Sequence, residues 1–553
     1  MLQPQNQTQK YEYLFNRIDD GTIKIPKFQR EFVWSKEQTA KLIDSIIKGF
    51  PIGTFIYWKT REELRHIKEV GNAKLPDIPK GDAAFYVLDG QQRMTSLYAV
   101  RKGLIIDRDG KELHYKDITI NLDYDPDDDE QVVNVEPPLD SPYISVHELL
   151  TVSPIELMDD YDREQLQKIQ TYRDRLTGYG FPVIIIEDYP IDIACEVFTR
   201  INTGGTELTL FEIMVAKTYD VDRDFDLARE YELLIDNNGT GKDLEDAGYE
   251  TIPASTILQC IAAHLRQDVR RKDILKLEKS AVIDNWSEIK SGIFDAVDYF
   301  SSHLRIPVSR LLPYNALLVP FTYFFIRNQG NPPNSLQNKL LIQYFWWASL
   351  SSRFTSAVES KLAADLKRID SILVSKPPEY RSDEEIELDL DDLMWRWFST
   401  GDAFCKAILC LYTYFQPRSF ASDALVKVDN SWLKVANSKN YHHFFPKNFI
   451  KKRPEYEDWE ANVILNITIV DDYLNKRSIR AKAPSKYMQE FAQNNPDLEE
   501  TMKTHLIGDL KQFGIFGAFN KDDYHKFLEQ RGTRVLKELN KRLKPKIPAQ
   551  TRN

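Results

Sequence analysis

Two adjacent histidines, His442 and His443, are the first candidates for chemistry in this sequence. They stand in the stretch NYHHFFPKNF, just before an aromatic and proline turn. A neutral imidazole, with a reference pKa of about 6.5, can take a proton from water or bind a metal ion. Adjacent residues of a strand point to opposite sides, so one histidine could bind metal while the other faces a water molecule.

Two asparagines follow these histidines. Asn466 lies in VILNITIV, whose alternation predicts a strand, and Asn475 comes nine positions later. We expect Asn466 to tie the loop back through its side chain. An amide carbonyl on a following helix, which Asp471 or Asp472 could cap, is a hard oxygen ligand suited to Mg²⁺. The set favours phosphodiester cleavage with one metal ion; a histidine pair packed in an aromatic hairpin is the alternative.

A second set of residues lies in VLDGQQRMTSL, where a predicted strand turns at Asp89-Gly90 and enters a predicted helix. The free amides of a helix N-terminus attract phosphate. Arg93 could add a bidentate phosphate contact, and Asp89 could hold a metal ion or water. Another Gln-Arg pair, Gln29-Arg30, stands in IPKFQREFVW. An ordinary Asp-Gly turn is the alternative.

The elements that would position these residues follow from hydrophobic periodicity. Strands are predicted at 53–58, 84–89 and 181–188, and helices at 37–50, 93–104 and 209–219. Thr209 and Glu212 have the spacing of a capping box. From about 240 to 425 the pattern is dominantly helical, and the acidic run SDEEIELDLDDL is predicted to open a helix or to cover a surface.

Length and composition bound the class of protein. At about 150 residues per domain, a chain of 553 residues predicts three or four domains. Four cysteines without a Cys-x-x-Cys pair argue against a disulfide scaffold and a thiolate zinc site. The N-terminus lacks a signal pattern, and the apolar stretch around Pro320 is too short for a bilayer. We therefore expect a cytoplasmic protein with no membrane partner.

Charge is unevenly distributed along the chain. The net charge of −11 argues against a uniformly basic nucleic-acid coat. Residues 434–489, however, contain eleven Lys or Arg and six Asp or Glu, and residues 531–553 contain eight and one. Since only charges within about 10 Å act strongly on a ligand, the C-terminal part can still bind DNA locally.

The pattern HHFFP…N…NK resembles the ββα-metal, or HNH, nuclease motif. The resemblance implies that His442 is a metal ligand, His443 the general base, Asn466 the loop organiser and Asn475 the second ligand. It also implies Mg²⁺ or Mn²⁺ as the cofactor. His442 stands where this motif often has Asp, and this departure weakens the ligand assignment.

The trailing segment NKRSIRAKAPSKY also resembles the HNH family. This resemblance implies that DNA phosphate is contacted by Lys476, Arg477 and Arg480.

Three N-terminal motifs, IPxFQRxxVW…PIG, DGQQR and VFTRINTGGTELT, together resemble the N-terminal domain of GmrSD-type proteins, which are modification-dependent restriction enzymes and related phage-defence proteins. The resemblance implies a ParB/sulfiredoxin-like fold that binds and hydrolyses nucleoside triphosphate. The implied nucleotide site comprises Asp89, Gly90, Gln91, Gln92, Arg93, Gln29, Arg30 and Asn202. Gly204 and Gly205 belong either to this site or to a turn between helices.

The predicted fold class is α+β with several domains. We expect a ParB/sulfiredoxin-like α/β domain at 1–235, a helical domain at 236–425 and an HNH-like nuclease domain at 426–553. The predicted function is nucleotide-regulated, metal-dependent cleavage of foreign or modified DNA. The alternatives are an NTPase whose degenerate HNH domain binds DNA without cutting, and a ParB-like nucleic-acid scaffold; RNA cleavage also stays open. Cutting both strands with one site per chain would favour a homodimer.

Overall fold

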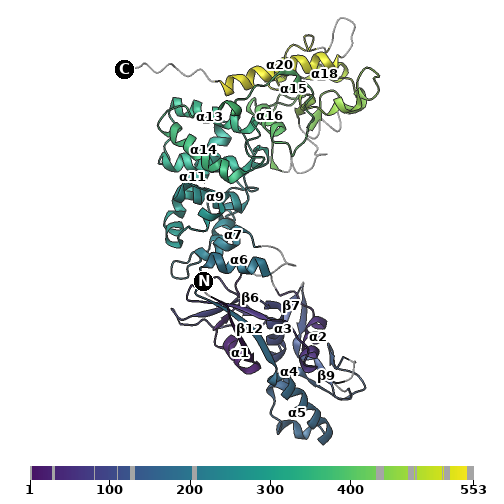
Figure 1. The fold of residues 1–553 in the computed structure, drawn as a ribbon. Helices are drawn as coiled ribbons and strands as arrows, with labels where there is room; N and C mark the ends of the chain where they lie inside the picture. Colours follow the sequence, from purple (N-terminus) through teal and green to yellow (C-terminus); the bar gives the residue numbers. More distant parts are fainter. Residues whose placement is uncertain are drawn as a thin grey trace. The chain divides into compact units, whose positions relative to one another are not determined.

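The chain divides into two compact units, Met1–Leu227 and Ala228–Asn553. Figure 1 shows both in the colours of the sequence. The structure is a computed structural model, and it describes residues 3–27, 32–79, 81–108, 110–124, 127, 131–201, 208–430, 441–470, 479, 482–513, 515 and 523–544. The predicted division of the second unit at residue 425 stays a prediction.

A five-stranded sheet is the centre of the first unit, as far as its residues are described. The strand order is β1-β12-β3-β6-β2. β1 is antiparallel to β12, β12 is parallel to β3, β3 is antiparallel to β6, and β6 is parallel to β2. Their bounds are Gln5–Lys10 (β1), Ile23–Lys24 (β2), Phe55–Thr60 (β3), Ala84–Asp89 (β6) and Gly180–Glu187 (β12).

Helices cover the sheet because its strands are apolar on both faces. One face packs against α1, α2, α3 and α5 in a core that includes Phe15, Ile43, Leu97 and Val183. On the other face α6 packs against β6. The bounds are Tyr11–Asp19 (α1), Lys36–Ile47 (α2), Gln91–Lys102 (α3), Arg163–Gly178 (α5) and Ile191–Ile201 (α6).

The remaining elements of the first unit are short. They include α7, whose Thr209–Glu212 capping box confirms the predicted helix start. Their bounds are Glu69–Val70 (β4), Ala73–Lys74 (β5), Ile105–Arg108 (β7), Lys111–His114 (β8), Thr119–Asn121 (β9), Val133–Asn134 (β10), Tyr143–Ser145 (β11), Val146–Thr151 (α4) and Leu210–Thr218 (α7).

The second unit is mainly helical and has a small two-stranded sheet. Its helices are Leu227–Ile235 (α8), Ala254–Arg266 (α9), Arg271–Ile274 (α10), Lys279–Ser302 (α11), Leu318–Arg327 (α12), Ser335–Leu350 (α13), Val358–Leu373 (α14), Leu390–Met394 (α15), Ala403–Tyr414 (α16), Lys447–Ile450 (α17), Pro484–Asn494 (α18), Leu498–Lys503 (α19) and Tyr524–Leu543 (α20). Its strands are Tyr441–His443 (β13) and Ile467–Ile469 (β14). The described chain is therefore α+β, with more than one compact unit.

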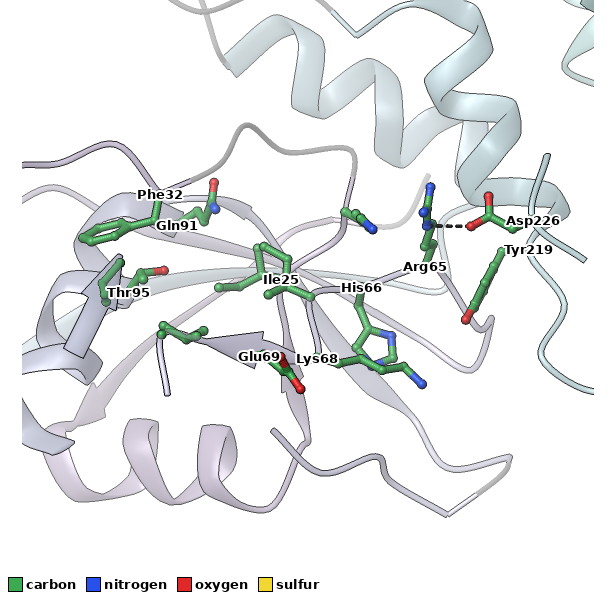
Figure 2. A pocket seen from close by; sticks show the side chains of 15 residues that line it. Ile25, Phe32, Arg65, His66, Lys68, Glu69, Gln91, Thr95, Tyr219 and Asp226 are labelled. Atoms are coloured by element: carbon green, nitrogen blue, oxygen red, sulfur yellow. Dashed lines mark ion pairs between the residues drawn. The ribbon is translucent and has the colours of Figure 1, made fainter. Parts of the chain in front are cut away.

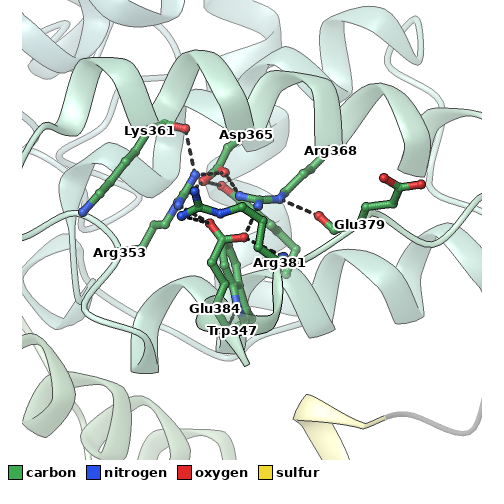
Figure 3. Close-up of polar contacts among 9 residues, drawn as sticks. Trp347, Arg353, Lys361, Asp365, Arg368, Glu379, Arg381 and Glu384 are labelled. Carbon is green, nitrogen blue, oxygen red and sulfur yellow. Dashed lines mark hydrogen bonds and ion pairs between the residues drawn. The ribbon is translucent and has the colours of Figure 1, made fainter. Parts of the chain in front are cut away.

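Four buried charges hold the acidic run against helices α13 and α14 (Figure 3). Arg353 bonds both Asp365 and Glu384, and Arg368 bonds the same two carboxylates. The Glu384 carbonyl accepts a hydrogen bond from Trp347 Nε1 at 2.9 Å. The Glu384 side chain is 9% exposed, and two opposite charges compensate its burial. The end of the run opens α15, with Asp389 as the N-cap, so the prediction that the run opens a helix is confirmed.

Arg531 of α20 supports the turn that leads into β14. Its side chain is fully buried. The guanidinium donates to the carbonyls of Leu465 at 2.5 Å and Ile467 at 2.7 Å, and it lies 4.4 Å from the ring centre of Tyr412. The last described helix thus fixes the backbone of the small sheet.

No helix in the described ranges is both long enough and apolar enough to cross a bilayer.

Candidate functional site

The DGQQR motif forms a sharp connection between β6 and α3. Gly90 has a φ of +92°, in the left-handed region, and a Cβ there would lie 2.4 Å from Phe55 Cδ1. Glycine is the residue that adopts this conformation without strain and leaves room for the phenyl ring. Asp89 therefore ends the strand, as predicted, and the helix begins at Gln91, two residues before the predicted start.

Arg93 binds the loop that precedes β3. Its guanidinium donates to the carbonyls of Ile52 at 2.6 Å and Thr54 at 3.0 Å, and to Asp89 Oδ2 at 3.1 Å. A Cβ on Gly53 would lie 2.6 Å from Arg93 Nη1, so this glycine lets the loop approach the guanidinium. In the structure Arg93 holds the motif together, and its contact with phosphate stays a prediction.

Gln92 organises a second loop. Its Oε1 accepts hydrogen bonds from the backbone N–H of Val33 at 2.8 Å and of Trp34 at 3.3 Å. The side chain is 7% exposed. The motif therefore fixes the FVW segment in front of α2 and the PIG segment in front of β3.

Gln91 and Thr95, one helical turn apart, face a cavity of about 670 Å³ (Figure 2). Thr95 is 3% exposed, and its hydroxyl has no hydrogen-bond partner among the described residues. The apolar wall consists of Ile25, Phe32, Ile67, Val70 and Ile106. The charged residues that line the cavity are Lys27, Arg65, Lys68, Glu69 and Asp226. The volume is in the range of small-ligand pockets.

In the second unit, Asn466 ties the loop that follows the histidine pair. Its Oδ1 accepts from Phe445 N at 2.8 Å, and its Nδ2 donates to the carbonyls of Phe445 at 3.0 Å and Ala461 at 2.9 Å. β13 and β14 are antiparallel, with His443 opposite Ile467. Asn466 ends a 3₁₀ turn just before β14, so the strand begins one residue after it.

His443 is held by a residue that the sequence analysis did not single out. Asn462 Oδ1 lies 3.1 Å from His443 Nε2, while Asn462 Nδ2 donates to the Phe398 carbonyl at 3.0 Å. A carbonyl can only accept, so the amide must present its oxygen to the imidazole. His443 Nε2 then carries the proton, and Nδ1 keeps its lone pair.

The electrostatic surroundings of His443 favour its neutral form. The pKa of His443 is lowered to about 4: burial and the positive charge of Lys447 lower it, and the hydrogen bond to Asn462 raises it. An imidazole that is neutral at pH 7 can accept a proton, which is what a general base requires.

The comparisons with known proteins bear on the first unit. The family model described as "GmrSD restriction endonuclease, N-terminal domain" matches residues 11–219. Residues 11–219 therefore resemble a GmrSD-type N-terminal domain, and this segment is called the GmrSD-type domain below. The sheet, the DGQQR motif and the cavity that it lines all lie in or directly beside this domain.

A relative shows that the likeness extends beyond the GmrSD-type domain. The uncharacterized protein MJ0686 of Methanocaldococcus jannaschii is 23% identical over 588 aligned positions, which cover 95% of this chain and 97% of the relative. Both units of the present chain therefore have a counterpart there.

Several residues predicted for the two sites lie outside the part of the chain that the structure describes. Outside the described residues lie Gln29, Arg30, Asn202, Gly204 and Gly205 of the nucleotide site, and Asn475, Lys476, Arg477 and Arg480 of the nuclease site. Asp471 and Asp472, the predicted helix caps, lie there too.

The described residues do not by themselves make a metal site. His442 is 3% exposed, and its ring packs edge-on against Phe420 and Tyr487. No group of three or more His, Cys, Asp or Glu side chains in the described ranges is arranged to hold a metal ion. Metal binding by His442 and Asn475 therefore stays a prediction.

Proposed function

We propose that the protein is a nucleotide-regulated, metal-dependent endonuclease that cuts foreign DNA in restriction or phage defence. The GmrSD-type domain supports the restriction class. The observation that carries the nuclease proposal is the oriented, neutral His443, held by Asn462 beside the loop that Asn466 ties. The resemblance to the HNH motif assigns His443 the role of general base and Asn466 that of loop organiser.

The chemistry at His443 follows from its tautomer. Nδ1 takes a proton from water, and the resulting hydroxide oxygen attacks phosphorus. A P–O bond of the backbone then breaks, and the leaving oxygen takes a proton from solvent. Asn462 accepts the Nε2–H throughout and faces the positive charge that develops on the ring. Such proton transfer contributes about 10²–10⁴-fold to rate. The requirement for Mg²⁺ or Mn²⁺ is proposed from the resemblance alone.

The nucleotide part of the proposal rests on the cavity in the GmrSD-type domain. Its apolar wall suits a base, and Gln91 and Thr95 add an amide and a hydroxyl-bearing side chain to the lining. We propose that nucleoside triphosphate binds there and is hydrolysed.

Nicking of supercoiled plasmid tests the nuclease proposal. Wild type, His443→Ala and the control His114→Ala, whose side chain is 41% exposed, are compared with Mg²⁺ or Mn²⁺, with EDTA, and with mixed nucleoside triphosphates on unmodified and modified DNA. We expect wild type and His114→Ala to nick, His443→Ala to lose nicking but keep nucleotide hydrolysis, and EDTA to stop nicking. Equal nicking by His443→Ala and wild type would refute the assigned base.

One observation favours a second candidate, an NTPase whose HNH-like region binds DNA without cutting it. His442 stands where the HNH motif often has a metal-binding Asp, and its ring is buried against the aromatic ring of Tyr487. This candidate predicts salt-sensitive DNA binding and nucleotide turnover with no strand breakage on any DNA.

A further inference from the structure

Two side chains of opposite charge meet on the wall of the cavity in the first unit (Figure 2). Arg65 Nε lies 2.8 Å from Asp226 Oδ2, and their side chains are 25% and 12% exposed. Both residues line the cavity. Arg65 precedes the β4–β5 hairpin, whereas Asp226 comes from the segment that leads out of the domain.

Asp226 directly follows a turn that backbone hydrogen bonds close. Asp220 and Phe225 exchange two backbone hydrogen bonds, of 3.0 and 2.9 Å. Tyr219 and Asp226 flank this turn, and both line the cavity. Leu227, the next residue, begins α8. The segment 219–226 thus contributes Tyr219 and Asp226 to the cavity wall, and the chain continues from it into the second unit.

The cations of the cavity differ in how they are occupied. Arg93 is not among the residues that line the cavity, and two carbonyls and Asp89 engage its guanidinium behind the motif. Lys68 pairs with Asp77 at 3.3 Å. Burial lowers the pKa of His66, so this ring adds little positive charge at neutral pH. Among the described residues, Arg65 presents a planar guanidinium on the wall and pairs with the carboxylate of Asp226, and Lys27 belongs to the same lining.

We infer that Arg65 is the phosphate-binding residue of this cavity and that the polyphosphate of a nucleotide takes it from Asp226. The inference rests on the proposed nucleotide binding. A phosphate group offers several charged oxygens in the geometry that a guanidinium binds bidentately, so it competes well with one carboxylate. Its negative charge also repels Asp226. The base then lies on the apolar wall, next to Gln91 and Thr95.

Displacement of Asp226 removes one of the contacts of the turn at 219–226, its ion pair with Arg65. Nucleotide binding thereby changes the contacts of the turn at 219–226, which directly precedes α8. Affinity and release are linked, because the phosphate and Asp226 compete for the same guanidinium and repel each other.

Nucleotide binding to the full chain tests this inference, with a non-hydrolysable ATP analogue and tripolyphosphate as probes in calorimetry. Asp226→Asn removes the competing charge at almost unchanged shape, so both probes should bind about tenfold tighter, which corresponds to about 1.4 kcal/mol. Arg65→Gln should weaken both. Asp224→Asn, on the exposed part of the same turn, should bind like wild type.

Hydrogen exchange of residues 219–226 provides a second readout. The analogue should speed exchange of these amides in wild type, and Asp226→Asn should exchange fast without it. Unchanged or weaker binding by Asp226→Asn, or slower exchange on binding, overturns the inference. If wild type binds but Arg65→Gln binds equally well, the nucleotide proposal stands and only the role of Arg65 fails. If wild type binds neither probe, both fail.

Discussion

The Nε2 of His443 faces the Oδ1 of Asn462 across 3.1 Å, and a second hydrogen bond from Asn462 to the Phe398 carbonyl fixes which atom of the amide is presented. The Phe398 carbonyl thus sets the tautomer of His443 indirectly, because it fixes the orientation of the Asn462 amide. This chain of contacts makes Asn462 a positioning residue for the proposed base.

Asn462→Leu should slow nicking between about tenfold and a hundredfold, less than the loss in His443→Ala. The imidazole would remain but could turn, and either nitrogen could carry the proton. Initial rates on supercoiled plasmid measure the effect, and Asn494→Leu, at an exposed position of α18, is the control. A rate equal to wild type would remove Asn462 from the mechanism.

Asn462→Asp should change the pH dependence of nicking. In wild type the pKa of His443 is lowered to about 4, so the rate should be nearly flat from about pH 5.5 upward. A carboxylate next to Nε2 favours the protonated ring and raises its pKa. Since the base must be neutral, the acid limb of the variant should move toward neutral pH. A profile that does not move would show that another group titrates.

Gly90→Ala should destabilise the first unit by about 2 kcal/mol or more, because a left-handed φ costs about 1–3 kcal/mol for a residue with a side chain. The added carbon would also overlap the Phe55 ring. The control Gly49→Ala has a φ of +71° and nothing within 4 Å of the added carbon, so it isolates the backbone cost. Thermal unfolding compares the two, and equal losses would mean that the ring moves aside freely.

Glu384→Gln should destabilise the second unit by about 3–5 kcal/mol, the cost of breaking a buried ion pair on one side. Arg353 and Arg368 would then share the single carboxylate of Asp365. The neighbouring Glu385→Gln changes an exposed side chain and should leave the urea midpoint almost unchanged. Similar midpoints for both variants would show that water reaches the four charges.

Local sequence patterns predicted much of the fold. The strand before Asp89, the turn at Gly90 and the helix after it are confirmed, and so is the capping box of Thr209 with Glu212. These features depend on neighbours a few residues apart, which periodicity and turn chemistry describe well.

The roles of single side chains were harder to predict, because they depend on partners far along the chain. The carbonyl partners of Arg93 lie about forty residues earlier in the chain, and its contact with phosphate stays a prediction. The contact between Arg65 and Asp226 joins residues 161 positions apart. The sequence alone offers no local signal for such pairs.

Arg531 gives the proposed nuclease a built-in order of assembly. Its guanidinium binds the carbonyls on either side of Asn466 from α20, a helix that the ribosome makes after β13, β14 and all the other described helices. A nascent chain released before this helix would have both histidines but an unsupported strand behind them. Such a fragment would therefore contain the proposed base without the hydrogen bonds that hold the backbone on either side of Asn466.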